Sequence, residues 1–212
     1  NLKMPFMEEG GEKLLKKNIK RIFATTNKKF VRLAKTIIVC VGTPVKSSKP
    51  DLEFFFKMFR EIKDHIDPKK LLVIRSSIYP GTCLKIQNFL GKNFNNISYC
   101  PERVVQGKSI SELPKLPQII SGVSKKSINQ SSKLFKLICK KIIITSILEA
   151  ELIKLFSNAW RYINFSISNQ FYMICEKFNI DFKNLRNNMI EGYERNRGIA
   201  KAGFTAGPCL YK

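Results

Sequence analysis

The chain has 212 residues, of which 44% are hydrophobic, and it carries 38 Lys and Arg against 16 Asp and Glu, a formal charge of +22. This length and apolar content allow a buried core and exclude an intrinsically disordered chain. No apolar run approaches the roughly 20 residues of a membrane-spanning helix, which argues against a membrane partner.

Short β-branched runs alternate with helical patterns along the first two thirds of the chain. The predicted helices cover 10–18, 51–66, 81–90 and 124–139. Strands that alternate with helices predict an α/β fold with a parallel sheet and right-handed crossovers. Several of the predicted strands are apolar almost throughout, which is typical of strands covered on both faces; they are 21–26, 36–42, 71–77, 97–102, 118–122 and 141–146.

The pattern changes near residue 146. Residues 149–177 contain no Gly or Pro and predict one long helix, followed by a second helix at 182–189 and a glycine-rich tail. We therefore expect an α/β domain over 1–146 and a helical domain over 147–212. Apolar side chains dominate the long helix, so we expect it to be buried nearly all round.

Three predicted strands end in segments suited to ligand binding, because ligands of parallel sheets bind beyond the carboxyl ends of the strands. The segments are 41–44 (VGTP), 75–82 (RSSIYPGT) and 100–103 (CPER). Glycine and small hydroxyl residues let a flat or phosphorylated ligand approach the backbone closely. For any one segment taken alone, an ordinary strand-to-helix turn with a helix cap is the simpler explanation.

Polar residues form one stripe on the long predicted helix: Lys154, Asn158, Arg161 and Asn169. A lysine on a buried helix requires a partner or a chemical task, because an unpaired charge in the interior is costly. A salt bridge between Lys154 and Glu149 or Glu151 is the alternative to a functional role.

The six cysteines are far apart, form no C-x-x-C pair and accompany a single histidine, so no metal site is expected. The sequence begins without a secretory segment, which predicts reduced thiols in the cytoplasm. Cys209 is flanked by glycine and small residues that would let a substrate reach its thiol. A nucleophile and a buried structural cysteine explain this segment equally well.

The high positive charge raises the question of nucleic-acid binding. The lysines are scattered in short pairs beside the predicted elements, with no stripe and no interleaved aromatic residues. This distribution favours a solvated basic surface and no nucleic-acid partner, with polyanion binding and the steering of anionic ligands as alternatives.

Together, five ordered segments resemble the UDP-glucose/GDP-mannose dehydrogenase family of nucleotide-sugar 6-dehydrogenases over essentially the whole chain. Residues 4–15 also resemble the segment that follows the family's second strand. The carriers are 41–44 (VGTP, followed by PDL), 75–82 (RSSIYPGT), 101–108 (PERVVQGK), 149–161 (EAELIKLFSNAWR) and 203–212 (GFTAGPCLYK).

The resemblance implies an incomplete Rossmann-like domain followed by an all-α central domain that dimerises through the long helix. It implies an NAD-dependent enzyme that oxidises C6 of a UDP-hexose or UDP-N-acetylhexosamine twice, through a cysteine thioester, to a uronic acid for polysaccharide synthesis. The implied catalytic residues are Cys209 as nucleophile, Lys154 and Asn158 as oxyanion donors, and Glu102 as base.

Further positions carry over as binding residues. In the family the arginine corresponding to Arg195 reaches the sugar nucleotide bound in the partner subunit. The implied NAD-binding residues are Val41, Gly42, Thr43, Pro44, Ser76, Ser77 and Gln106. The implied sugar-nucleotide residues are Glu102, Arg103, Lys154, Asn158, Arg195, Gly203, Phe204, Gly207 and Lys212.

The chain also departs from the family pattern. It contains no G-x-G-x-x-G turn for the pyrophosphate, and the family's aspartate after the cysteine would fall at position 213. We therefore expect a fragment that is inactive alone. Gln106 stands where the UDP-glucose enzymes have a second glutamate, and Ser77 where many members have threonine. The form of residues 101–104 (PERV) and 207–210 (GPCL) looks more like the N-acetylhexosamine enzymes than the glucose enzymes. A non-catalytic basic α/β module that binds polyanions remains the alternative function.

Overall fold

The computed structural model describes residues 4–43, 45–46 and 49–204. The chain divides into two compact units, Asn1–Lys154 and Leu155–Lys212. Among the described residues, none of the helices combines the length and apolar content that a membrane span requires.

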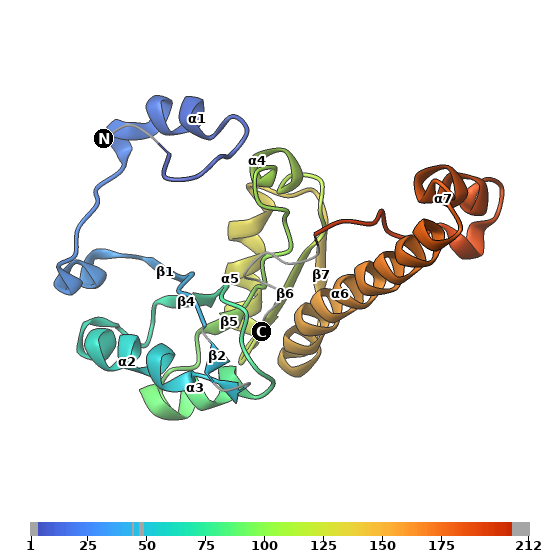
Figure 1. Cartoon of the computed structure of the whole chain (residues 1–212). Coiled ribbons are helices and arrows are strands. Elements are labelled where there is room, and N and C mark those ends of the chain that lie inside the picture. The colour runs from blue at the N-terminus through green and yellow to red at the C-terminus, as the bar shows by residue number, and fades with distance from the viewer. Residues whose placement is uncertain (1–3, 44, 47–48, 205–212) are drawn as a thin grey trace. The chain divides into compact units, whose positions relative to one another are not determined.

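A five-stranded sheet forms the centre of the first unit, in the order β1-β4-β5-β6-β7 (Figure 1). Leu72 of β4 pairs with Ile37 of β1 on one side and with Ile97 of β5 on the other, both in parallel. β6 runs antiparallel to β5 and parallel to β7. The strands are β1 (Thr36–Val39), β4 (Leu71–Ile74), β5 (Ile97–Tyr99), β6 (Gln118–Gly122) and β7 (Ile142–Ile144).

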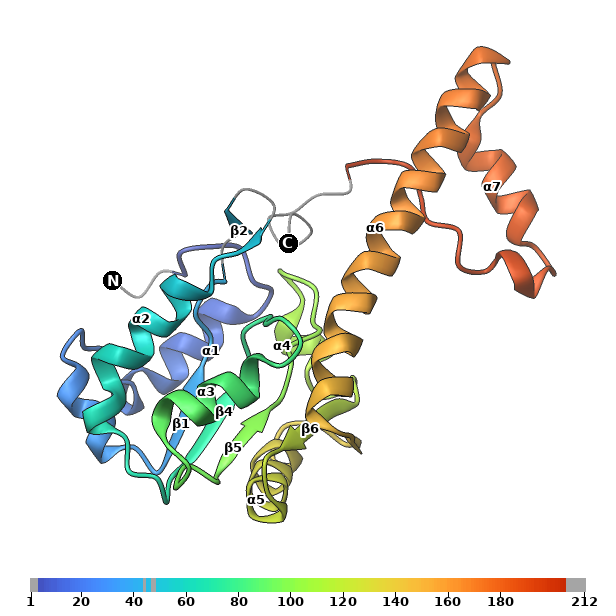
Figure 2. The same ribbon diagram turned by 90° about the horizontal axis from the view of Figure 1, so that it is seen from below.

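Helices cover both faces of this sheet, as the turned view in Figure 2 shows. Alternate residues of β4 belong to two different cores, because successive strand side chains point to opposite faces. Leu72 and Ile74 pack in one core with Phe55 and Phe59, whereas Val73 packs in the other with Phe135. The helices of the first unit are α1 (Gly11–Asn18), α2 (Leu52–Ile62), α3 (Thr82–Leu90), α4 (Ser109–Glu112) and α5 (Lys125–Lys136).

The predicted α/β class and nearly all predicted elements are confirmed, with two corrections. Residues 21–26 form no strand: a short 3₁₀ helix, Ile19–Arg21, leads into an extended segment in which Phe23 is 71% exposed. β6 is antiparallel to β5, and the connection between them contains only the one-turn helix α4 in place of the longer helix that usually crosses between parallel strands. A two-residue ladder between β2 (Val45–Lys46) and β3 (Lys49–Pro50) was not predicted.

α6 (Ile147–Lys177) begins in the first unit and continues into the second, where it is followed by α7 (Phe182–Ile190) and a 3₁₀ turn, Glu194–Asn196. The predicted long helix is confirmed, but the expectation that it is buried nearly all round is wrong. Large apolar side chains repeat along one exposed stripe of α6 at helical spacing; they are Phe156, Trp160, Ile163, Ile167, Phe171 and Ile174.

A capping box begins α6. The Ser146 hydroxyl accepts a hydrogen bond from the backbone N–H of Glu149 at 3.3 Å, and the Glu149 carboxylate accepts one from the N–H of Ser146 at 2.9 Å. The Thr145 hydroxyl donates to the same carboxylate. These hydrogen bonds, the one from Thr145 first, lower the pKa of Glu149 from its usual value of 4.5 to about 2.

The cap predicts a specific pH dependence of stability. Because the folded-state pKa of Glu149 is depressed, its contribution is present above pH 5 and is lost as the pH falls towards 2. At pH 7, Glu149→Gln should lower the thermal midpoint by roughly 2–4 °C, as expected for loss of one cap in a chain of this size. The difference from wild type, measured by circular dichroism, should narrow as the pH falls from about 5 to 2.

Glu176→Gln is the matched control, since Glu176 lies in the last turn of the same helix, where a negative charge opposes the helix dipole. This variant should not be destabilised at pH 7. A Glu149→Gln difference that is constant between pH 7 and pH 2 would contradict the assignment of the cap.

Candidate active site

The ends of β1 and β4 meet through the hydroxyl groups of Ser76 and Thr43, for which the family resemblance implies a role in cofactor binding. The Ser76 hydroxyl donates to the carbonyl of Val41 at 2.7 Å. The Thr43 hydroxyl donates to the carbonyl of Ser77 at 2.6 Å. The two segments therefore form one edge beyond the carboxyl ends of neighbouring parallel strands, the usual place for a ligand in such a sheet.

Gly42 leaves this edge open. A Cβ built on Gly42 would meet no atom within 4 Å, and the residue is exposed. A flat group can therefore approach the backbone here, as the predicted cofactor-binding role of this edge requires. Pro44 lies outside the described residues, and Gln106 is exposed on the loop that follows β5.

Glu102 follows β5 and its carboxylate is held from two sides. One oxygen accepts hydrogen bonds from its neighbours' backbone N–H groups, Arg103 at 2.8 Å and Val104 at 3.1 Å. The other oxygen forms an ion pair with Arg75. The Glu102 side chain is still 36% exposed, so water and a substrate can reach it.

Lys154 contacts the same residue from α6. Its ammonium group donates a hydrogen bond to the backbone carbonyl of Glu102. The structure thus brings together two of the predicted catalytic residues, which are 52 positions apart in the sequence. The alternative partner, Glu151, has both carboxylate oxygens engaged elsewhere, on the N–H groups of Gly81 at 2.6 Å and Cys83 at 2.9 Å.

Glu151 was not predicted as a site residue, although it sets the position of α6. It is fully buried, and this burial raises the pKa of its carboxyl group. The two N–H groups that it accepts from lie at the start of α3, where the helix dipole favours a negative charge. Gly81 adopts a φ of +82° at this helix start, a conformation that favours glycine.

The loop from 101 to 108 is fixed along its length. The Glu112 carboxylate accepts from the N–H of Val105 at 2.8 Å, and the Glu8 carboxylate accepts from the N–H of Gly107 at 3.1 Å. The guanidinium of Arg103 donates to the carbonyl of Pro117, away from the Glu102 carboxylate. Arg103 is therefore bound to the protein backbone.

The second unit carries the remaining predicted residues that the structure describes. Asn158 is half-buried on α6, while Arg195 is exposed with its guanidinium 6.0 Å from the centre of the Tyr193 ring. Phe204 is fully exposed. Gly207, Cys209 and Lys212 lie outside the described residues.

Asn169 anchors the segment that leads to the cysteine motif. Its amide nitrogen donates to the carbonyl of Gly203 at 3.0 Å, and its amide oxygen accepts from the N–H of Gly203 at 2.8 Å. The sequence placed Asn169 on the polar stripe of the helix but gave it no role. Its spacing from Lys154 on that stripe was the available signal.

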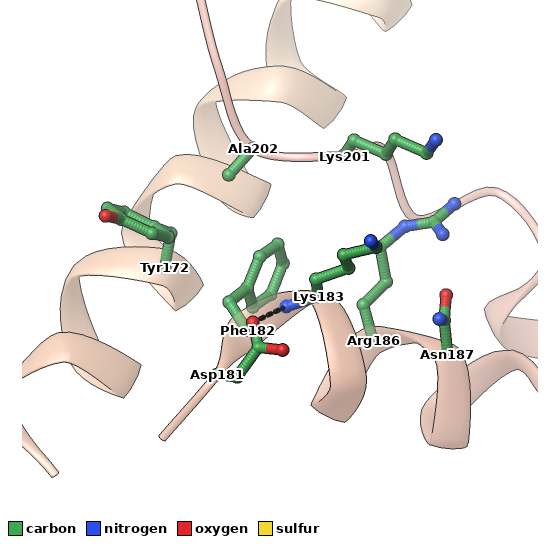
Figure 3. A pocket seen from close by; sticks show the side chains of 8 residues that line it. All are labelled: Tyr172, Asp181, Phe182, Lys183, Arg186, Asn187, Lys201 and Ala202. Carbon is green, nitrogen blue, oxygen red and sulfur yellow. Dashed lines mark hydrogen bonds between the residues drawn. The ribbon is translucent and has the colours of Figure 1, made fainter. Parts of the chain in front are cut away.

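A cavity of about 370 Å³ lies beside the same segment, between α6, α7 and residues 201–202 (Figure 3). The Asp181 carboxylate accepts from the N–H of Lys183 at the start of α7, as the dashed line marks. Arg186 reaches across the cavity, and its guanidinium donates to the carbonyls of Ile199 and Ala200 at 2.7–3.1 Å. Its charge therefore fixes the chain that enters the cysteine segment.

The described cysteines are free thiols, most of them buried. Burial raises the pKa of Cys100 to about 12 and raises that of Cys83 well above its usual value. Thiols of this kind are poor nucleophiles. Cys40, which follows β1, is exposed. Within the described ranges, no group of three or more His, Cys, Asp or Glu side chains is placed to hold a metal ion.

Family models account for nearly the whole chain. Residues 1–139 match the NAD binding domain of the UDP-glucose/GDP-mannose dehydrogenase family, and residues 148–212 match the central domain of that family. The chain belongs to this family. Its NAD-binding domain contains the edge formed by Val41, Thr43, Ser76 and Ser77, and its central-domain match contains Lys154 and Cys209.

Relatives within the family have named activities. The chain is 36% identical over 154 residues to a UDP-N-acetyl-D-mannosamine dehydrogenase of Methanococcus vannielii, which covers 70% of this chain and 36% of the relative. It is 31% identical over 179 residues to a UDP-glucose 6-dehydrogenase of Rickettsia bellii, covering 81% of this chain and 40% of the relative.

A solved structure shares the fold. The UDP-D-ManNAc dehydrogenase of Pyrococcus horikoshii matches with a TM-score of 0.88 and 26% identity, over 98% of this chain and 52% of that one. The chain thus spans between about a third and a half of the length of these relatives.

The burial of the thiols predicts selective alkylation of the native chain. Iodoacetamide at pH 8 should modify the exposed Cys40 and leave Cys83 and Cys100 unmodified until the protein is unfolded in urea, because a buried thiol neither ionises nor meets the reagent. Peptide mass mapping at several times reads out each site. Equal labelling of Cys40 and Cys100 before unfolding would contradict the packing of β5.

Proposed function

We propose that the whole protein containing these 212 residues is an NAD-dependent nucleotide-sugar 6-dehydrogenase that converts a UDP-N-acetylhexosamine to its uronic acid. The observation that carries this proposal is the meeting of Lys154 and Glu102 beyond the end of β5, in the sheet whose β1 and β4 ends form the open edge at Gly42. The names of the Methanococcus and Pyrococcus relatives support the N-acetylated substrate class over UDP-glucose.

NAD, when bound, accepts the two electrons of each oxidation. Val41, Gly42, Thr43, Ser76 and Ser77 would hold its nicotinamide end. The hydroxyls of Thr43 and Ser76 are committed to backbone carbonyls, so their part is to fix the edge rather than to donate to the cofactor. The open backbone at Gly42 supplies the approach.

Lys154 is suited to stabilise an oxyanion. The ammonium group of Lys154 is oriented by its hydrogen bond to the carbonyl of Glu102. A donor that is already oriented can stabilise the negative charge that develops on oxygen in the transition state. Asn158 lies one helical turn further along α6 and would add a second donor. Glu102, exposed and held in place, would take a proton from the water that hydrolyses the final intermediate.

Cys209 would supply the nucleophile. A thiolate adds to the aldehyde formed by the first oxidation, and the second oxidation leaves an acyl group joined to sulfur as a thioester. The high pKa of Cys83 and Cys100 argues against these two as the nucleophile. Asn169 and Arg186, which anchor residues 199–203, would hold the segment that enters the cysteine motif.

The cellular role that we propose is the supply of uronic acids for surface polysaccharide, in the cytoplasm. Free thiols at all five described cysteines support a reducing compartment. The domain division that we propose is the one predicted from the sequence, with the cofactor domain over 1–146 and the central domain over 147–212. The capping box at Ser146 and Glu149 supports a boundary there.

The exposed apolar stripe of α6 is the surface that we propose for dimerisation with a second copy of the chain. Phe156 and Trp160 are each 65% exposed, and Ile163 is 51% exposed. A row of large apolar side chains along several helical turns is too extensive for a surface that stays in water. Two such stripes are self-complementary, as an interface with two-fold symmetry requires.

The mechanism predicts different defects for two variants of the whole protein. Cys209→Ser should retain binding of NAD and UDP-N-acetylmannosamine but form almost no uronate, because a serine hydroxyl without an adjacent base adds poorly to the aldehyde. Lys154→Ala should slow turnover by on the order of 10²–10³-fold through loss of an oxyanion donor. NADH absorbance and quantification of uronate measure both.

Cys40→Ser is the matched control, because Cys40 is an exposed thiol in the first unit. It should turn over like the wild type. Uronate produced by Cys209→Ser at the wild-type rate would remove the nucleophile assignment, and failure of the wild type to reduce NAD with any UDP- or GDP-hexose would overturn the proposed function.

The proposed interface predicts an oligomeric state. Sedimentation velocity at about 20 µM, well above the Kd of a stable dimer, should show a dimer or a larger assembly for the wild type. Trp160→Glu should shift it to monomer by placing a charge in the centre of the apolar stripe. Phe54→Glu, on an exposed position of α2, should leave the assembly unchanged. A wild type that sediments only as monomer would refute the interface.

A further inference from the structure

Arg75 is a charged residue in the interior of the first unit for which the sequence gives no task. It directly follows β4, and only 10% of its side chain is exposed. A buried guanidinium is costly unless its hydrogen-bonding groups and its charge are matched. The groups that contact the Arg75 guanidinium therefore indicate its role.

Three groups surround the Arg75 guanidinium. One terminal nitrogen forms the ion pair with Glu102, and the other donates to the side-chain oxygen of Gln118 at 3.2 Å. The face of the guanidinium lies 4.9 Å from the centre of the Phe135 ring. Gln118 in turn donates to the carbonyl of Pro101, the residue before Glu102. Arg75 thus fixes the start of the loop as well as the carboxylate.

Neighbouring groups bind both carboxylate oxygens of Glu102 and its backbone carbonyl. One oxygen faces Arg75, and the other accepts the N–H groups of Arg103 and Val104. The backbone carbonyl of Glu102 accepts from Lys154 on the α6 side. The side chain that is held in this way remains 36% exposed, and its carboxylate keeps lone pairs for one water molecule.

We propose that Arg75 is a positioning residue for the hydrolytic step of the reaction, which it serves by holding the Glu102 carboxylate in the orientation that faces the attacking water. The inference rests on the proposed function of Glu102. The ion pair with Arg75 and the N–H groups of Arg103 and Val104 fix the orientation of the carboxylate, and a general base must be held within reach of the proton that it accepts.

The step that Arg75 supports is balanced without another reactant. A water oxygen attacks the acyl carbon of the Cys209 thioester while Glu102 takes the proton of that water. The C–S bond then breaks, sulfur leaves as the thiolate, and the product is the uronate carboxyl group. Arg75 touches neither the water nor the sugar, and the two preceding oxidations do not use Glu102 as a base in this scheme.

The contacts also explain why arginine stands here rather than lysine. A guanidinium binds Glu102 and Gln118 with two nitrogens and stacks on Phe135 with its face, whereas an ammonium is a point charge. Arg75→Lys should keep a cation beside Glu102 but lose the hydrogen bond to Gln118 and the stacking on Phe135. Arg75→Met should lose the cation as well.

Rapid-quench kinetics of the whole protein with NAD and UDP-N-acetylmannosamine test the inference. Arg75→Met should form NADH at a rate near that of the wild type in the first turnover, then accumulate sugar covalently bound to the enzyme. Its release of uronate should slow by about 10²-fold, the range of a general base. Arg75→Lys should fall between Arg75→Met and the wild type.

A double mutant separates positioning from support of the fold. If Arg75 acts through Glu102, Arg75→Met combined with Glu102→Gln should release uronate no more slowly than Glu102→Gln alone. Arg60→Met is the matched control, because Arg60 pairs with Glu53 on the exposed face of α2. It should release uronate like the wild type.

Several results would overturn the inference. One is that Arg75→Met slows NADH formation and uronate release equally and accumulates no covalent intermediate. Another is that the losses in the rate of uronate release are additive in the double mutant. If circular dichroism shows that Arg75→Met is unfolded, Arg75→Lys is tested in its place. A folded Arg75→Lys that releases uronate at the wild-type rate and accumulates no covalent intermediate would contradict the inference. A wild type that reduces no NAD with any nucleotide sugar overturns the proposed function, whereas failure in the Arg75 variants alone leaves that function standing.

Discussion

The buried carboxylate of Glu151 is the constraint on which the arrangement of the first unit depends. A fully buried carboxylate must be hydrogen-bonded, and Glu151 meets this need with the N–H groups of Gly81 and Cys83 at the start of α3. This fixes both the position and the rotation of the first turns of α6 against the end of β4. Lys154, three residues later on the same face of the helix, consequently reaches the carbonyl of Glu102.

Charged and amide side chains in the two units bind backbone groups and so fix the position of loops. Glu8 and Glu112 hold the loop after β5 by its N–H groups, and Arg103 holds it through the carbonyl of Pro117. In the second unit, Arg186 and Asn169 do the same for residues 199–203. Such contacts give the backbone N–H and carbonyl groups of the loops hydrogen-bond partners, which apolar packing alone would not supply. Rigid supports of this kind are what a reactive group on a loop requires.

The long helix α6 combines three physical environments along one element. Its first turn is capped by Ser146 and Glu149, its next turn carries the buried Glu151, and its later turns expose a stripe of large apolar residues. An isolated helix with this composition would associate with other apolar surface. One continuous helix thus carries a cap, a buried carboxylate and the surface that we propose for dimerisation.

Periodicity and turn chemistry in the sequence determined the α/β class, six of the seven α-helices among the described residues, and five strands, because each is a local pattern of apolar and capping residues. Motif order also predicted that Glu102 and Lys154 belong to one site, and in the structure Lys154 contacts the carbonyl of Glu102. Only the tertiary structure decided that β6 is antiparallel and that 21–26 forms no strand, since strand pairing depends on partners distant in sequence. The contacts of Arg75, Glu151 and Asn169 likewise could not be predicted from the neighbouring sequence. Each acts through a residue 27 to 70 positions away, and only the folded chain sets which buried charge or amide meets which partner.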